Sequence, residues 1–282
     1  MILSPFSPIF FQPRKGRNGV PSRYVQTFAR TDAIQLQLIG VTGDSAPTTK
    51  VCSACDETEL YTIDWNSWKM NTHDLLYFTT IRGLDVGYYF IRMDGFGDSE
   101  PFKVTDYAPE LQQTTLIQYA MKDNRQRDDA VFLINHMPTF FDFRVPGGFK
   151  DGGWSFAVEN EQFVTDDADI VELYGMESTS KTFTMGEGDG VPIWFAELLN
   201  RLLTCHYVYF DGVRYSRKDS NVPEISAQDE LLNSFIVTQV VQRVQKLDPV
   251  IEQNNHVALR RIDSTYYRNV PAGNSNVQRK ID

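Results

Sequence analysis

Cys52 and Cys55 form a CxxC pair, a spacing that can hold zinc or carry a redox disulfide. Structural zinc requires four ligands, but the chain has no second CxxC pair, its nearest histidine is His73, and Cys205 lies in another predicted domain. A redox pair begins a helix in a βαβ unit, whereas this pair lies between predicted strands. We therefore interpret both cysteines as incidental reduced thiols and predict no metal site.

The glycine-rich stretch at 186–190 precedes a predicted helix, which is where a phosphate-binding loop would lie. It lacks the lysine and the hydroxyl residue of such loops. Glu187 and Asp189 would also place negative charge where a phosphate binds. We interpret the stretch as a flexible turn with a helix cap, and we predict no cofactor.

An acidic run at Asp166, Asp167 and Asp169, with Glu172 nearby, offers the hard oxygen ligands that calcium prefers. Its spacing does not match an EF-hand loop, so we interpret it as a solvated surface. A glycosidase needs two carboxylates about 5 to 10 Å apart in a cleft, a separation that the fold decides and that no sequence pattern gives. The four histidines are scattered, and neither a serine nucleophile elbow nor a His-Glu-x-x-His motif appears. No catalytic residue is predicted, and a hydrolase acting on cell-wall glycan is the least supported hypothesis.

The charge of the chain is concentrated in its middle. The formal net charge is -10, and the segment 106–190 holds 16 Asp and Glu against 6 Lys and Arg, which accounts for the whole excess. A surface this acidic repels phosphate backbones, so nucleic acid is not expected as the main partner. Basic protein surfaces and divalent cations remain as candidate partners.

The length of 282 residues suits two domains, and the odd count of three cysteines suits a reducing cytoplasm. No apolar run approaches 18 residues, so no membrane span is predicted. The first eleven residues lack a basic segment and contain prolines, which is atypical of a signal peptide.

Alternating polar and apolar residues predict that the fold is mainly β. Residues 23–105 contain several short strands separated by turns, such as Ile34–Leu38, and no helical period separates them. This pattern predicts an antiparallel β-sandwich domain.

Residues 106–268 are predicted to form a second β-rich, sandwich-like domain with one amphipathic helix packed on a sheet. Two aromatic strands flank an expected turn at 146–148, and the helix near 190–204 has Asp189 as its cap and Pro192 in its first turn. The Asp-Gly pair at 211–212 predicts a tight hairpin, and 234–244 reads as a final long strand.

Both ends of the chain are expected to lie outside these domains. Residues 1–22 contain four prolines and are predicted to form an extended arm, although a packed terminus is an equal alternative. Residues 269–282 lack periodicity and are predicted to be a flexible tail. The interface candidates are an apolar and basic part of the arm and a charged loop: Ile9, Phe10, Phe11, Arg14, Arg17, Arg125, Arg127, Asp128 and Asp129.

Five segments, in this order, resemble tail proteins of tailed bacteriophages and prophages of gut bacteria, including crAss-like phages, over about residues 28–267. The segments are Ser99–Val104, Leu116–Tyr119, Phe143–Phe149, Gly190–Trp194 and Val208–Tyr215. The resemblance implies a virion component, assembled in the host cytoplasm as a hub, ring or distal-tail adaptor subunit. Its implied partners are copies of itself in a ring-like oligomer and other tail proteins, and the family brings no catalytic signature.

The first hypothesis is therefore a structural tail protein whose acidic segment 106–190 matches a less acidic neighbour. The alternative is a carbohydrate-binding adhesion module of the particle. That alternative requires an exposed row of aromatic side chains on the first domain, for which the candidates are Tyr61, Trp65, Trp68, Tyr88 and Tyr89. The same residues would otherwise belong to the core of the sandwich.

Overall fold

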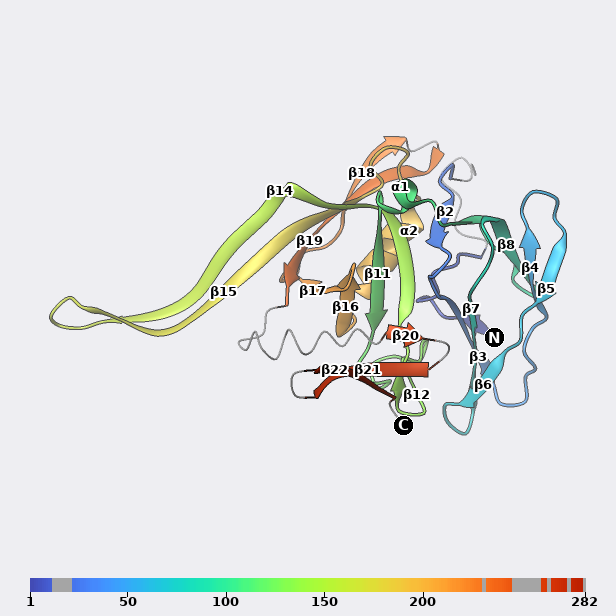
Figure 1. Ribbon diagram of the computed structural model, residues 1–282, viewed down its shortest axis with the longest axis horizontal. Coiled ribbons are helices and arrows are strands. Elements are labelled where there is room, and N and C mark those ends of the chain that lie inside the picture. Colours follow the sequence, from blue (N-terminus) through green and yellow to red (C-terminus); the bar gives the residue numbers. More distant parts are fainter. Residues whose placement is uncertain (12–21, 230–231, 245–259, 263–264, 273–274, 281–282) are drawn as a thin grey trace. The chain divides into compact units, whose positions relative to one another are not determined.

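The computed structural model describes residues 1–11, 22–229, 232–244, 260–262, 265–272 and 275–280 (Figure 1). The chain divides into two compact units. The first comprises residues 1–157 and 179–242, and the second comprises residues 158–178 and 243–282. No helix within the described ranges is long and apolar enough to cross a bilayer.

Two sheets of the first unit form a β-sandwich. One sheet has the order β1 (Ile2–Leu3), β3 (Ile34–Val41), β7 (Asp74–Ile81) and β6 (Asn66–Lys69). The other has the order β2 (Gln26–Ala29), β10 (Phe102–Thr105), β8 (Gly87–Met93), β4 (Thr49–Ser53) and β5 (Glu59–Thr62), with β9 (Gly97–Asp98) on β8. Leu36 of β3 and Val51 of β4 are fully buried in one hydrophobic cluster shared by both sheets. The predicted sandwich is confirmed, apart from a parallel pairing of β2 with β10.

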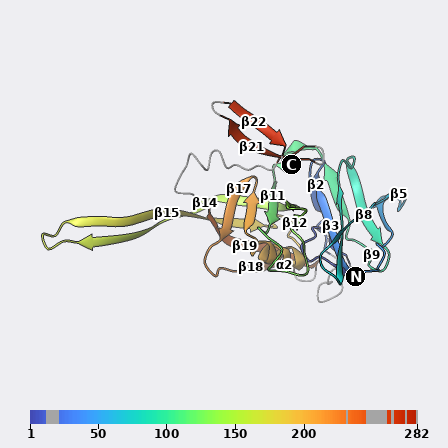
Figure 2. The same ribbon diagram turned by 90° about the horizontal axis from the view of Figure 1, so that it is seen from below.

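A further sheet of seven strands, called the second sheet below, is separate from the two sheets of the sandwich. It belongs mostly to the first unit, and its strand pairings form a closed ring. Its order is β15 (Ile170–Met185), β14 (Phe141–Val164), β11 (Thr114–Ala120), β16 (Tyr207–Phe210), β17 (Val213–Arg217), β19 (Ser234–Arg243) and β18 (Glu224–Asp229). β15 also pairs antiparallel with β19 from Ser180 to Met185, so the pairings return to their starting strand. β14 and β15 run side by side as one long hairpin, as both Figure 1 and Figure 2 show.

The remaining elements are short. α1 (Ala108–Leu111) precedes β11, and β12 (Leu133–Ile134) pairs with β13 (Met137–Pro138). In the second unit, β20 (Arg260–Ile262), β21 (Thr265–Ala272) and β22 (Ser275–Lys280) form an antiparallel three-stranded sheet. The described residues beyond 269 are therefore strands, which differs from the flexible tail predicted there; residues 281–282 lie outside the described ranges.

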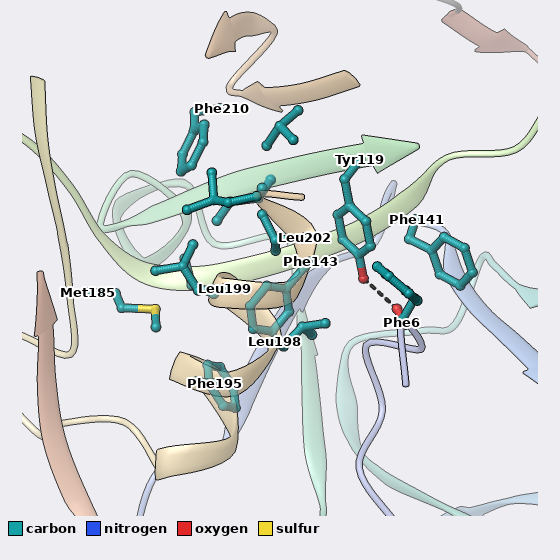
Figure 3. Packing of buried hydrophobic residues seen from close by; sticks show 14 of the residues in the cluster. Phe6, Tyr119, Phe141, Phe143, Met185, Phe195, Leu198, Leu199, Leu202 and Phe210 are labelled. Carbon is teal, nitrogen blue, oxygen red and sulfur yellow. Dashed lines mark hydrogen bonds between the residues drawn. The ribbon is translucent and has the colours of Figure 1, made fainter. Parts of the chain in front are cut away.

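The predicted helix is α2 (Ile193–Leu202), which packs on the second sheet. Figure 3 shows Phe195, Leu198 and Leu199 of this helix among buried side chains that include Phe143 and Met185. The N-cap residue is Pro192 and no side chain caps the helix, so the predicted cap at Asp189 is wrong. The carbonyl oxygen of Asp189 instead accepts a hydrogen bond of 2.7 Å from the Ser234 hydroxyl.

The stretch at 146–148 is not a turn, because β14 continues through it. Gly147 has φ of +114°, and a Cβ atom there would lie 2.2 Å from the carbonyl oxygen of Thr184. The glycine therefore lets β14 pass close to β15 at the point where its pairing with β11 ends, at Pro146. The prediction of a turn mistook this close approach for a reversal of the chain.

Two other local predictions are confirmed. Asp211 and Gly212 both have positive φ, 48° and 82°, as a two-residue hairpin between β16 and β17 requires. β19 covers the predicted final strand from Ser234 to Arg243.

The first eleven residues are packed into the first unit, so the predicted extended arm is wrong for them. β1 pairs antiparallel with β3, and the fully buried Phe6 lies with its ring 5.1 Å from that of Phe132. The Tyr119 hydroxyl donates a hydrogen bond of 2.5 Å to the carbonyl oxygen of Phe6 (Figure 3). Arg201 of α2 donates to the carbonyl oxygen of Pro5 at 2.9 Å. The apolar side chains of this segment are thus buried within their own chain. Residues 12–21 lie outside the described ranges.

The expected domain boundary at residue 105 falls inside the first unit. The sandwich and the second sheet keep separate hydrophobic clusters, but buried polar groups join them. The Gln37 side chain donates to the carbonyl oxygen of Val131 at 2.7 Å and accepts from its amide at 3.0 Å. The Asp142 carboxylate of the second sheet accepts a hydrogen bond of 3.0 Å from the Ala33 amide of the sandwich.

Candidate interaction surface

The apolar interface candidates near the N-terminus contact their own chain. Ile9 is buried in the sandwich core. Phe10 stacks on Phe195 with ring centroids 5.4 Å apart, and Phe11 lies 6.4 Å from Phe96. These three side chains therefore stabilise the first unit and are not offered to a neighbour in this structure. Arg14 and Arg17 lie outside the described residues.

The charged loop at 122–129 is held against the body of the first unit. Arg127 forms an ion pair with Asp129, and its guanidinium carbon lies 4.9 Å from the centroid of the Phe6 ring. The hydrogen bond from Arg127 lowers the pKa of the Asp129 carboxyl. Arg125 and Asp128 are exposed. Of the four candidates in this loop, two are thus exposed and two are paired with each other.

A hollow of about 250 Å³ lies between the N-terminal segment and α2. Its lining includes Phe10, Trp194 and Glu197, together with Arg201, which already donates a hydrogen bond to Pro5. The hollow therefore presents mainly apolar surface beside one cation and one acid. Nothing in its geometry brings together a nucleophile, a base and an oxyanion donor.

The CxxC pair is divided between two environments. Cys52 is fully buried in β4, whereas Cys55 is exposed in the turn that follows. Burial raises the pKa of the Cys52 thiol. Within the described ranges, no three His, Cys, Asp or Glu side chains are grouped so that they could hold a metal ion.

The aromatic residues proposed as a sugar platform do not form a row. Tyr89 is buried and its hydroxyl donates to the Asp85 carbonyl oxygen at 2.8 Å. The indole N–H groups of Trp65 and Trp68 donate to Thr49 and Asn135. Tyr61 and Tyr88 are exposed, but they lie on different faces of their sheet. Tyr61 pairs with Val51 and Val51 pairs with Ile91, so these side chains share one face, whereas Tyr88 is three positions from Ile91 in β8 and lies on the other face.

The glycine-rich stretch at 186–190 is a tightly packed turn. A Cβ atom at Gly186 would lie 2.4 Å from the carbonyl oxygen of Phe235, and one at Gly190 would lie 1.9 Å from the Ser234 hydroxyl. Both glycines have positive φ. Because glycine adopts positive φ without strain and has no Cβ atom, these two residues allow the turn to pack against β19.

The acidic run at 166–169 forms the turn of the β14–β15 hairpin. The Thr165 amide donates to the carbonyl oxygen of Asp169 at 2.8 Å, and the Asp169 amide donates to the Thr165 hydroxyl at 3.1 Å. Asp166 and Asp167 are exposed. The run therefore closes a hairpin and points its carboxylates into solvent, as the interpretation of a solvated surface expects.

The part of this hairpin that belongs to the first unit carries an exposed aromatic pair. Trp154 is 43% exposed and Phe156 is 76% exposed, and their rings stack with centroids 5.8 Å apart. The Lys181 ammonium lies 3.5 Å from the centroid of the Trp154 ring, a cation–π contact. Tryptophan is one of the residue types enriched among the hot spots of protein interfaces.

The part of the hairpin in the second unit, residues 158–178, is called the hairpin tip below. It exposes six large apolar side chains, which come from both strands: Val158, Phe163, Val164, Ile170, Val171 and Leu173. Among the described residues, no third strand pairs with the tip, because β14 meets β11 only at 141–146 and β15 meets β19 only at 180–185. The tip thus combines exposed apolar side chains with two open strand edges.

Sequence patterns identified the strands of this hairpin but not their exposure. Trp154, Phe156 and Val158 alternate with small or polar residues, and this pattern is typical of a strand with one buried face. The interleaving of apolar residues with acids in 158–178 was the available signal that the apolar side chains of these strands are exposed.

No family model matches the chain, and no curated protein matches it. One similar solved structure is that of Dpr2 Ig1-Ig2 in complex with DIP-Theta Ig1-Ig3, which is 10% identical. The match covers 83% of this chain and 92% of that chain, with a TM-score of 0.17. At this TM-score nothing about function follows from the similarity. The fold class itself, mainly β with antiparallel sheets, is established by the strands described above.

Proposed function

We propose that this chain is a structural subunit of a phage tail, a hub, ring or adaptor protein of the virion that assembles in the host cytoplasm with copies of itself and with other tail proteins. The observation that carries the proposal is the β14–β15 hairpin, whose apolar side chains are left exposed by the described part of the chain. The resemblance of five sequence segments to phage tail proteins supplies the biological setting.

The energetics favour a protein partner for the hairpin. Fully burying a Val, Leu, Ile or Phe side chain is worth about 1.5–3 kcal/mol, and the hairpin exposes eight large apolar side chains in its two parts. Monomeric soluble proteins rarely expose large contiguous apolar patches, and a two-stranded hairpin without a further packing partner is marginally stable. Association would bury the exposed apolar side chains and would also give the hairpin a further packing partner.

The experiment is to image the purified chain by negative-stain electron microscopy and to measure its mass by light scattering. We expect closed rings or stacked oligomers. The double variant Trp154→Ser with Phe156→Ser should shift the population towards monomer, because it removes the aromatic pair. Tyr107→Ser is the matched control, since Tyr107 is 63% exposed but lies outside the hairpin. A chain that stays monomeric at every concentration, with and without the neighbouring tail proteins, would contradict the proposal.

A further inference from the structure

Residues 153–157 of β14 combine the exposed aromatic pair with an open strand edge. Among the described residues, β11 pairs with β14 only at 141–146, so this later part of β14 has β15 as its one neighbouring strand. An open edge presents unpaired backbone N–H and C=O groups, which a further strand can bind. Residues 153–157 include neither a proline nor a charged residue, two features that commonly prevent pairing at an edge. This stretch is therefore suited to accept another strand.

The sequence of this stretch is complementary to itself in an antiparallel alignment centred on Ser155. In that alignment, Trp154 of each strand lies opposite Phe156 of the other, and Gly153 lies opposite Ala157. Alternate side chains of a strand share a face, so both aromatic pairs lie on one face and the small side chains lie on the other. Aromatic pairs that face each other across antiparallel strands stabilise a sheet. The best partner for this edge is thus the same edge of another molecule.

The two aromatic rings are already held in place in the single chain. The rings of Trp154 and Phe156 stack with their centroids 5.8 Å apart, although the two side chains are 43% and 76% exposed. The Lys181 ammonium lies 3.5 Å from the centroid of the Trp154 ring and restrains that ring further. Side chains that are ordered before binding lose less conformational freedom on association. The pair therefore presents a prepared surface to a second pair of rings.

We propose that two copies of the chain pair through the β14 edge at residues 153–157, antiparallel about Ser155. The partner is a second copy, because a stretch of strand cannot pair with itself within one chain. No charged side chain belongs to this stretch, so its residues meet without like-charge repulsion, whereas the hairpin tip has seven acidic residues and no Lys or Arg. The contact is isologous, and it joins copies two by two. This inference rests on the proposed function, since it names one subunit contact of the proposed oligomer.

The test is disulfide trapping in the full-length chain, with Cys55→Ser in every variant to remove an exposed native thiol. Ser155→Cys places a thiol on the twofold axis of the proposed contact, where the two Cα atoms lie about 4.5–5.5 Å apart, a separation that a disulfide spans. Oxidation should convert most of this variant to a covalent dimer on a denaturing gel. Ala157→Cys is the matched control, since this residue is also exposed and shares the face of Ser155. Its two thiols would lie about 13 Å apart along the strands, so it should remain monomeric on the gel.

A second measurement asks whether the aromatic pairs hold the contact. Adding Trp154→Ser and Phe156→Ser to the Ser155→Cys variant should lower the yield of covalent dimer about tenfold, whereas adding Tyr107→Ser should leave it unchanged. Equal trapping of Ser155→Cys and Ala157→Cys, or trapping that survives loss of both rings, would overturn the inference.

The same samples separate the inference from the proposed function. If the chain forms rings or stacks but Ser155→Cys is not trapped, the inference is wrong and the proposed function stands. If Ser155→Cys is trapped but only dimers form, the inference stands and the proposed function is wrong. A chain that is always monomeric and never trapped contradicts both.

Discussion

Arg144 donates two hydrogen bonds to the carboxylate of Asp32, from Nε at 2.7 Å and from Nη2 at 2.9 Å. Arg144 belongs to β14 of the second sheet, and Asp32 lies in the turn between two strands of the sandwich. Both side chains are nearly buried, at 11% and 2% exposed. This bidentate pair crosses the position at which the sequence predicts a domain boundary. It is one of the contacts that join the sandwich to the second sheet within the first unit.

The first prediction concerns this pair. Arg144→Met should lower the free energy of unfolding by about 3–5 kcal/mol, because it leaves the Asp32 carboxylate buried without its counter-charge. Urea denaturation measures the change. Arg92→Met is the control, since Arg92 pairs with Asp98 at a half-exposed site and its loss should cost about 0–1 kcal/mol. Equal losses in the two variants would show that Arg144 and Asp32 do not hold the modules together.

The second prediction concerns pH. Burial raises the pKa of the Asp142 carboxyl above its ordinary value of 3.8, despite the hydrogen bonds it accepts from Gln118 and Ala33. The folded state therefore binds this proton more tightly than the unfolded state. Its contribution to stability is complete below the unfolded pKa and is lost as pH rises from about 3.8 through the raised folded pKa.

Chemical denaturation at a series of pH values checks this sign. Asp142→Asn should remove a component of stability that falls with rising pH above 3.8. Asp56→Asn is the opposite control, because hydrogen bonds from Ser53 and Thr58 lower the pKa of the Asp56 carboxyl, and its contribution therefore grows as pH rises. Parallel curves for the unmodified chain and Asp142→Asn would contradict the assignment.

Sequence patterns correctly predicted the elements that depend on only a few neighbouring residues. The alternation at Ile34–Leu38 predicted β3, and the Asp-Gly pair predicted the hairpin of β16 and β17, because side-chain period and positive φ act over a few residues. The pairing of β15 with β19, the ion pair of Arg144 with Asp32 and the burial of Phe6 join residues more than fifty positions apart. No periodicity encodes such partners, so the closed sheet was missed, and an extended arm and a packed N-terminus were left as equal alternatives.

The candidate interaction surface was missed for a related reason. A strand with alternating apolar residues is predicted in the same way whether its apolar face meets a core or faces solvent. For Trp154 and Phe156, only the structure shows that the described residues leave their side chains exposed. Phe10 was predicted to be an interface candidate, but its ring stacks on Phe195 of its own chain.

The third prediction concerns the close approach of β14 and β15. Gly147→Ala should destabilise the fold by at least about 1 kcal/mol, because the residue has φ of +114° and its Cβ would meet the carbonyl oxygen of Thr184. Gly152→Ala is the control in the same strand, since nothing lies within 4 Å of a Cβ atom there. Thermal denaturation should separate the two variants. Equal melting temperatures for the two variants would show that a Cβ atom at position 147 does not clash with the carbonyl oxygen of Thr184.

The fourth prediction separates a packed N-terminus from an extended arm. Phe6→Ala should lower the free energy of unfolding by about 3–5 kcal/mol, because the ring is fully buried among Tyr119, Phe132 and Phe141. Ile2→Ala in the same segment should change it by less than about 0.5 kcal/mol, since Ile2 is 66% exposed. Equilibrium unfolding followed by tryptophan fluorescence measures both. If the segment were an arm that contacts only neighbouring subunits, the isolated chain would be equally stable in both variants. In a packed segment, the cost of removing an apolar side chain depends on how deeply that side chain is buried, so Phe6→Ala must cost more than Ile2→Ala.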